Sequence, residues 1–219
     1  MEKTPVIVFC LPGNNFSGKF LDSFLNLADY CHRAGIKYFV SRRESPVVYY
    51  VRSLVLGGDL RRGENQKPFD GKLKYTHLMW IDSDMVFTVK HFQSLFNHDK
   101  DIVSGIYKME NNTQYAVVEN LDMTYLKQHG TFQFLVDEDM RKKSGLFKVA
   151  YTGLGFTLIK YGVFEALTYP WFEPLFFKHE DIVEFCSEDV SFCKKARDKG
   201  FDVWVDPLLR IGHEKKGIL

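Results

Sequence analysis

The chain has 219 residues, of which 45 % are hydrophobic and 16 % aromatic, a composition that predicts one compact α/β domain with a substantial core. Lys and Arg number 29 against 28 Asp and Glu, and this formal net charge of +1 excludes a global positive field directed at nucleic acid. The sequence has no run of about 18 apolar residues, so we expect no membrane span.

The N-terminus and the cysteines together predict a cytoplasmic protein. Met1–Pro5 leads directly into an apolar strand and lacks the layout of a signal peptide. The cysteines show no C-x-x-C spacing, so we interpret them as reduced, mostly buried thiols and not as a disulfide framework or a zinc site. They are Cys10, Cys31, Cys186 and Cys193.

In the first half of the chain, apolar periodicity and turn residues predict alternating strands and helices. A helix with apolar residues at helical spacing is expected to begin at Ser17 or Asn15 and to end at Gly35. Before and after it we predict a strand at Val6–Leu11, a turn at Pro12–Asn15, a strand at Ile36–Ser41, a loop and then a helix within Pro46–Leu56, a polar loop at Gly57–Lys74, a helix at Lys90–Asn97 and a strand at Asp101–Tyr107.

The second half is less regular, and residues 108–148 alternate short β-like stretches with charged turns that allow no assignment. Beyond them we predict strands at Lys148–Thr152 and Phe156–Ile159, a helical turn at Val163–Leu167, a lid at Pro174–Glu184, an amphipathic helix at Glu188–Lys199 and a strand at Val203–Val205. The sequence contains no repeat or linker, so we expect one domain over residues 1–219.

The most informative segment is His77–Phe87, in which an apolar run ends at Asp82–Ser83–Asp84 and a second apolar run follows. The first run is typical of a buried parallel strand, and open α/β sheets bind ligands at the carboxyl ends of such strands. Asp82 and Asp84, at i and i+2, point to the same side of an extended backbone. Paired carboxylates in apolar surroundings need a cation, so we predict a Mg²⁺ or Mn²⁺ site that holds a diphosphate. The alternative is a solvated turn.

A second dense pattern lies near the C-terminus. Glu188 and Asp189 begin the predicted helix, where the helix dipole favours negative charge, so the pair can also be a simple N-terminal cap. Gly212–His213 follows the last predicted strand, and the alternative for His213 is a surface position near the end of the chain.

Taken together, these segments resemble the GT-A family of glycosyltransferases, which use nucleotide-sugar donors and a divalent metal. The matching segments are Asp82–Ser83–Asp84, Thr152–Phe156, Tyr169–Phe172, Glu188–Asp189 and His213, in the order of the family. The size and opening sequence also resemble the glycosyltransferase domains encoded by large algal viruses, which would place the protein in the host cytoplasm.

The resemblance implies a GT-A (Rossmann-like) domain with a central, mostly parallel sheet flanked by helices. Residues 1–107 would form its nucleotide-binding half and residues 108–219 its acceptor-binding half. It makes Asp84 the principal metal ligand, His213 a third ligand and Asp82 a ligand of the metal or the ribose. The expected donor contacts are Pro12, Gly13, Asn14, Arg52, Asp82, Ser83, Gly153 and Gly155, with Arg52 chosen because a guanidinium offers bidentate donors to phosphate.

The implied reaction moves a sugar from a UDP-sugar to a hydroxyl of a glycan, with Mn²⁺ or Mg²⁺ as the cofactor. A carboxylate must take the proton of the acceptor hydroxyl, and we expect Asp189 first and Glu188 second. The sequence leaves open the sugar, the linkage, the stereochemistry and whether the chain belongs to a longer multidomain protein.

Three other functions compete with this interpretation. Asp82–Val86 also fits the D-x-D-x-[TV] motif of haloacid-dehalogenase-like phosphatases, in which Asp82 would be a covalent nucleophile, although about 80 residues precede it here. A nucleotidyltransferase would need a Gly-rich basic loop, which Leu11–Lys19 lacks. A non-catalytic carbohydrate-binding protein would use the aromatic stretch Tyr169–Phe177 and would not need a base.

Overall fold

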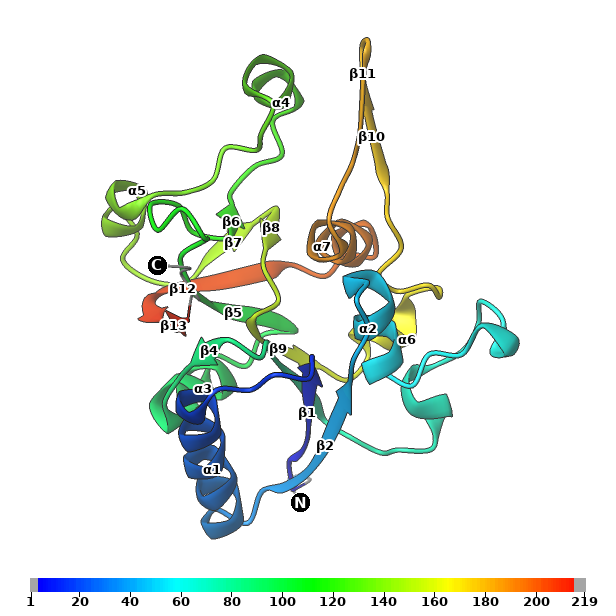
Figure 1. Ribbon diagram of the computed structural model, residues 1–219, viewed down its shortest axis with the longest axis vertical. Helices are drawn as coiled ribbons and strands as arrows, with labels where there is room; N and C mark the ends of the chain where they lie inside the picture. The colour runs from blue at the N-terminus through cyan, green and yellow to red at the C-terminus, as the bar shows by residue number, and fades with distance from the viewer. Residues whose placement is uncertain (1–3, 215–219) are drawn as a thin grey trace.

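A computed structural model describes residues 4–214 and has a seven-stranded sheet at its centre, in the order β2-β1-β3-β9-β5-β12-β7 (Figure 1). Five strands run in one direction, whereas β9 and β7 run in the other. The predicted α/β class with a central, helix-flanked sheet is confirmed, and the sheet is mixed because β9 lies antiparallel between β3 and β5. The strands are β1 (Val6–Pro12), β2 (Lys37–Arg43), β3 (His77–Ile81), β5 (Ile102–Ile106), β7 (Phe147–Val149), β9 (Phe156–Lys160) and β12 (Val203–Arg210).

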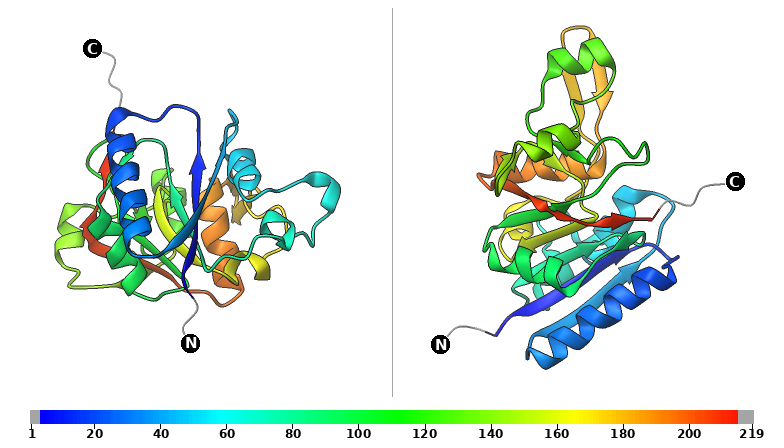
Figure 2. Two further views of the ribbon diagram at one scale, coloured as in Figure 1. Left: turned by 90° about the horizontal axis from the view of Figure 1, so that it is seen from below. Right: turned by 90° about the vertical axis from the view of Figure 1, so that its left-hand side faces the viewer.

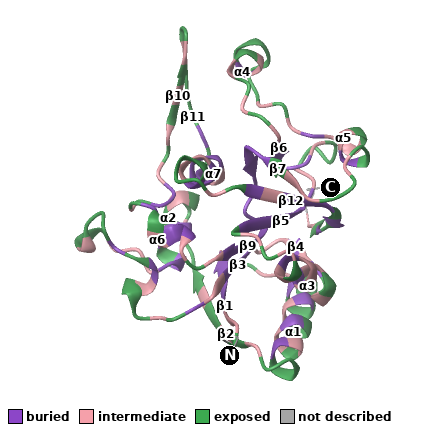
Figure 3. Cartoon of the chain, turned by 180° about the vertical axis from the view of Figure 1, so that it is seen from behind, coloured by how far each residue is buried: buried purple, intermediate pink, exposed green. Residues whose placement is uncertain are grey.

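Helices cover both faces of the sheet, as Figure 2 shows. On β1, Ile7 and Phe9 pack into the hydrophobic cluster of α1 (Gly18–Arg33) and α3 (Val89–Asn97). Their neighbours Val8 and Cys10 point to the opposite face, since side chains alternate along a strand. That second cluster includes residues of α2 (Val48–Val55), α6 (Val163–Ala166) and α7 (Glu188–Asp198). The buried residues accordingly concentrate in the inner strands of the sheet and on the inner sides of the helices, whereas the edge strand β2 is largely exposed (Figure 3).

The segment over residues 108–148, which the sequence left unassigned, contains only short elements. Outside the main sheet the structure forms β4 (Met85–Val86), β6 (Val117–Val118), β8 (Tyr151–Thr152), β10 (Phe176–His179), β11 (Ile182–Phe185), β13 (Gly212–His213), α4 (Met123–His129), α5 (Asp137–Arg141) and 3₁₀ turns at Leu60–Arg62 and Pro68–Gly71. The predicted lid is the hairpin β10–β11, which projects from the body beside α4 (Figure 2). Lys127 of α4 forms ion pairs with Glu180 and Asp181 at the hairpin turn.

Two strand predictions were wrong in extent. Lys148–Thr152 is not one strand, because Ala150 turns away and donates its N–H to Val118 and Glu119 carbonyls, so β7 and β8 join different sheets. The strand expected at Val203–Val205 continues to Arg210, because β12 pairs with β5 again after a register shift.

Several local predictions are confirmed. Ser17 is the N-cap of α1, and its hydroxyl accepts the N–H of Phe20 at 3.1 Å. The four cysteines are buried and free. Within residues 4–214, no helix combines the length and the apolar character that crossing a membrane requires.

Candidate functional site

The carboxyl ends of the parallel strands meet at one edge of the sheet and bring the predicted site residues there. The turns after β1, β3, β5 and β12 lie at this edge. Because β9 is antiparallel, the segment before it, Gly153–Gly155, reaches the same edge, where Asp82 donates its N–H to the Gly155 carbonyl at 3.0 Å. This is the edge at which open α/β sheets bind ligands.

Asp84 and His213 meet because two short strands pair behind the Asp-x-Asp turn. Met85 donates its N–H to the Asp82 carbonyl at 3.2 Å, and β4 then pairs antiparallel with β13. The register sets His213 opposite Met85, and its Nε2 lies 2.9 Å from Asp84 Oδ2. The structure thus joins two predicted metal ligands that are 129 residues apart in the sequence.

The second ring nitrogen of His213 makes this pair suitable for a cation. Nδ1 lies 2.6 Å from the Lys108 carbonyl oxygen, which can only accept, so Nδ1 carries a proton. In its neutral form the imidazole then presents the lone pair of Nε2 beside the Asp84 carboxylate oxygen, and in its protonated form it donates to that oxygen. Two acceptors at that distance need a proton or a metal ion between them, and a backbone carbonyl on the other nitrogen is the usual support of a metal-binding histidine.

Asp82, the remaining predicted ligand, has another partner. Arg52 donates to both of its oxygens, from Nη1 at 2.9 Å and from Nη2 at 3.0 Å. Among the described residues, no group of three or more His, Cys, Asp and Glu side chains is arranged to hold a metal ion. Of the three predicted ligands, Asp84 and His213 are therefore in contact, whereas Asp82 binds Arg52, and the binding of a metal by these residues stays a prediction.

Arg52 joins three elements through a buried ion network. The Arg52 side chain is 4 % exposed, and its guanidinium lies over the ring of Trp80 and donates from Nε to Glu188 Oε1 at 2.9 Å. Burial alone would lower the pKa of Arg52, but the charges of Asp82 and Glu188 outweigh it and the pKa is raised. Arg52 of α2 thus holds the end of β3 and the start of α7 together, and its expected contact with a diphosphate stays a prediction.

Removing this arginine should cost stability. Arg52→Met leaves the buried Glu188 carboxylate without its partner, and breaking a buried ion pair typically costs about 3–5 kcal/mol. Arg61→Met is the matched control, because Arg61 pairs with Asp59 at the surface and such pairs contribute at most about 1 kcal/mol. Urea unfolding of both variants measures the difference, and an equal loss in both would show that the Arg52 network is not a strong support.

Asp189 lies at the first turn of α7 in a half-buried position. Its Oδ1 accepts the N–H of Val190 at 2.9 Å and the Ser187 hydroxyl, and its Oδ2 accepts the Tyr151 hydroxyl at 3.1 Å. Desolvation first, and then the charge of Glu188, raise the pKa of Asp189 to about 6. A carboxylate with a pKa this close to neutrality is suited to general-base chemistry.

A pocket of about 270 Å³ lies between the turn after β1, the Asp-x-Asp turn and α2. Gly13 has φ +117°, a conformation that favours glycine, and a Cβ there would meet Ser83 at 3.2 Å. Of the expected donor contacts, Asn14 is exposed and does not line the pocket. The lining residues are Pro12, Gly13, Ser45, Pro46, Val48, Val51, Arg52, Asp82, Ser83 and Asp84.

Gly153 and Gly155 have a packing role that the sequence did not reveal. A Cβ on Gly153 would overlap the Tyr107 hydroxyl, and one on Gly155 would meet the Tyr107 ring at 2.8 Å. The Tyr107 hydroxyl accepts the N–H of Gly155 at 3.1 Å. Both glycines are buried against this ring, and their contact with a donor stays a prediction.

Two tyrosines at this edge were missed by the sequence reasoning. Burial first, and then the charges of Asp82 and Asp189, raise the pKa of Tyr107. Burial and Asp189 likewise raise the pKa of Tyr151. Each tyrosine stands at or beside the end of an apolar strand in the sequence, and that position was the available indication.

Comparison with known proteins identifies a solved structure that shares the fold of this chain. No family model and no curated protein matches the chain. Among solved structures, A197 from STIV is similar over 99 % of this chain and 97 % of its own, with 19 % identity and a TM-score of 0.51. The inositol-1-phosphate CTP transferase from T. maritima is similar over 92 % of this chain and 88 % of its own, with 13 % identity and a TM-score of 0.38. The first likeness shows a shared fold over nearly the whole chain, and the second is too distant to carry an argument.

Proposed function

We propose that this protein is a metal-dependent glycosyltransferase that moves a sugar from a nucleotide-sugar, a UDP-sugar by family analogy, to a hydroxyl of a glycan. The observation that carries the proposal is the contact between Asp84 and His213, 2.9 Å apart at the end of β3. An oxygen and a nitrogen ligand suit Mn²⁺, and a Mg²⁺ or Mn²⁺ ion bound by so few side chains completes its coordination with water and substrate phosphates.

The pocket beside Asp84 supports the proposal because it offers a binding place for the nucleotide-sugar donor. In it the backbone at Pro12–Gly13 would face the nucleoside, and Asp84 would hold the metal on the diphosphate together with His213. When bound, the metal acts as a Lewis acid for the negative charge that the diphosphate gains as its bond to the sugar breaks.

Asp189 is the better of the two expected bases. Glu188 is buried in an ion pair with Arg52, so its charge is already balanced, whereas Asp189 has a pKa raised to about 6 and only neutral hydrogen-bond donors. In the proposed step the acceptor oxygen forms a bond to the anomeric carbon, its proton passes to an Asp189 oxygen, and the diphosphate leaves with the electron pair of the broken bond.

The phosphatase alternative is weakened by the same geometry. A haloacid-dehalogenase-like mechanism needs Asp82 as an attacking carboxylate with an accessible oxygen. Both oxygens of Asp82 accept hydrogen bonds from Arg52, which orients the group and lowers its nucleophilicity.

Nucleotide binding tests the proposal directly. We expect calorimetry to show UDP binding that requires Mn²⁺, with GDP at least tenfold weaker, a difference of about 1.4 kcal/mol. UDP release from UDP-sugars should likewise require Mn²⁺. Tighter binding of GDP than of UDP would change the proposed nucleobase of the donor from uracil to guanine. A protein that binds no nucleoside diphosphate in the presence of metal would contradict the proposed glycosyltransferase function.

A further inference from the structure

The two oxygens of Asp189 are held unequally by hydrogen bonds. Oδ1 accepts the N–H of Val190 at 2.9 Å and the Ser187 hydroxyl. Oδ2 accepts the Tyr151 hydroxyl at 3.1 Å and, within residues 4–214, no second donor. A carboxylate oxygen offers two lone pairs. Oδ1 therefore has both lone pairs in use, whereas Oδ2 keeps one that can take a proton.

Tyr151 supplies its hydroxyl from a rigid position. It lies in β8, which pairs with β6, and its side chain is buried with the ring edge-on to Phe134. The thiol of Cys193 in α7 donates to the carbonyl of the next residue, Thr152, at 3.6 Å, which joins β8 to α7. The Tyr151 hydroxyl is therefore fixed relative to the helix that carries Asp189, and it restricts the rotation of that carboxylate.

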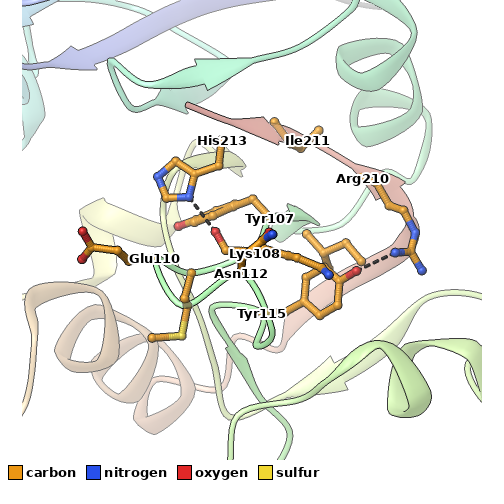
Figure 4. A pocket seen from close by; sticks show the side chains of 10 residues that line it. Tyr107, Lys108, Glu110, Asn112, Tyr115, Arg210, Ile211 and His213 are labelled. Atoms are coloured by element: carbon orange, nitrogen blue, oxygen red, sulfur yellow. Dashed lines mark hydrogen bonds between the residues drawn. The ribbon is translucent and has the colours of Figure 1, made fainter. Parts of the chain in front are cut away.

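The other buried tyrosine at this edge of the sheet, Tyr107, contacts a proposed metal ligand. Its ring lies edge-on to the ring of His213, with the two ring centroids 5.2 Å apart (Figure 4). Substitution of Tyr107 would therefore disturb the Asp84–His213 pair directly. Tyr151 is the better residue with which to test the base, because its hydroxyl donates to Asp189 itself.

The charged groups that act on Asp189 oppose each other. Burial is the main cause of the raised pKa of Asp189, and the charge of Glu188 raises it further. The Ser187 hydroxyl and the charge of Arg52 lower it, and Arg52 is paired with Glu188 at 2.9 Å. The other titratable groups that interact with Asp189 have pKa values raised by burial first and stay neutral; they are Tyr49, Tyr107, Tyr151, Cys186 and Cys193. Hydrogen bonds from hydroxyl groups are therefore an important support of the charged form of Asp189.

We infer that Tyr151 is a positioning residue for Asp189, and that its hydroxyl turns the carboxylate so that Oδ2 takes the proton of the acceptor. The inference rests on the proposed function for the role of Asp189 as the base. In the step, the acceptor oxygen bonds to the anomeric carbon, the diphosphate leaves with the electron pair of the broken bond, and the proton passes to the free lone pair of Oδ2. Tyr151 keeps its own proton throughout and donates to the charged carboxylate, the form that can act as a base.

Tyr151→Phe tests the inference, because it removes the hydroxyl and keeps the buried ring. The lost donor stabilised the charged carboxylate, so we expect the pKa of Asp189 to rise by about one unit. Carboxyl-carbon NMR of the full chain with labelled aspartate measures this pKa, and the Asp189 signal is the one missing from Asp189→Asn. The pH below which turnover falls should rise together with the pKa.

Turnover at high pH and nucleotide affinity provide two further measurements on the same variant. Above the pH of the fall, turnover should decrease roughly ten- to hundredfold, because the carboxylate loses its fixed orientation. The affinity for UDP with Mn²⁺ should not change, since Tyr151 is not among the residues that line the pocket proposed for the donor.

Two other variants accompany Tyr151→Phe. Tyr75→Phe is the matched control, because Tyr75 is a buried tyrosine that also donates to a carboxylate, Glu165 Oε1 at 2.6 Å, but precedes β3 and so lies at the opposite edge of the sheet. It should leave the Asp189 pKa and turnover unchanged. Ser187→Ala removes an exposed hydroxyl from Oδ1 and no helix-capping bond, and it should also raise the pKa of Asp189.

The outcomes separate this inference from the proposed function. An unchanged Asp189 pKa in Tyr151→Phe, a turnover profile that does not follow that pKa, or a loss of UDP affinity would each overturn the positioning role. An unchanged pKa in Ser187→Ala would contradict the assignment of the free lone pair to Oδ2. A pKa that rises in both variants but not in Tyr75→Phe, in a protein that releases no UDP from any sugar donor, would support the hold of Tyr151 on Asp189 and reject the glycosyltransferase.

Discussion

Asp84→Ala is expected to abolish both sugar transfer and metal-dependent binding of UDP while the protein stays folded. The Asp84 side chain is 43 % exposed, so its removal creates no cavity in the core. The metal would lose one of its two side-chain ligands and with it the stabilisation of the leaving diphosphate. Calorimetry of UDP with and without Mn²⁺, together with a UDP-release assay, measures both effects.

Asp22→Ala is the matched control for this variant, because it removes an exposed carboxylate from α1, far from the Asp84–His213 pair in sequence and on a different element. It should bind UDP and Mn²⁺ as the unmodified protein does. Near-normal transfer by Asp84→Ala, or full activity of the unmodified protein in EDTA, would reject the metal site.

The sequence predicted the parts of this site that depend on local patterns. Periodicity and turn residues located β1 and α7 to within about two residues, and an apolar run that ends in Asp82–Asp84 indicates a strand end regardless of the rest of the fold. The same holds for Ser17, since a helix cap depends on its immediate neighbours.

Sequence patterns could not predict the features that depend on contacts between residues far apart in the chain. Guanidinium binds carboxylate and phosphate with the same geometry, so nothing local could show that Arg52 pairs with Glu188, 136 residues away. The sequence also could not predict that β9 lies antiparallel between β3 and β5. An apolar strand that is buried on both faces has the same sequence pattern whichever direction it runs. Gly153 illustrates a third case, in which a glycine that suggested a ligand makes room for Tyr107.

Asp189→Asn should lower turnover by roughly two to four orders of magnitude, the usual contribution of a general base. The amide keeps the shape of the carboxylate and can accept the Val190 N–H, but it cannot take the acceptor's proton. UDP affinity with Mn²⁺ should hardly change, because the base contacts the acceptor and not the diphosphate. Glu188→Gln is the comparison, and a larger loss of turnover there would move the base to Glu188.

The pH dependence of the same variant distinguishes a base from a structural residue. In the unmodified protein, turnover should fall as the pH drops through about 6, the pKa of Asp189. Asp189→Asn should not show this fall in turnover at low pH.

The stability of the two proteins provides the second measurement. Because folding raises the pKa of Asp189 from 3.8 to about 6, its contribution to stability is present below pH 3.8 and is lost as the pH rises through 6. Asp189→Asn should therefore melt at a higher temperature than the unmodified protein at pH 8, with the difference shrinking below pH 4. A variant that melts lower at pH 8 and also loses UDP affinity would make Asp189 a structural residue.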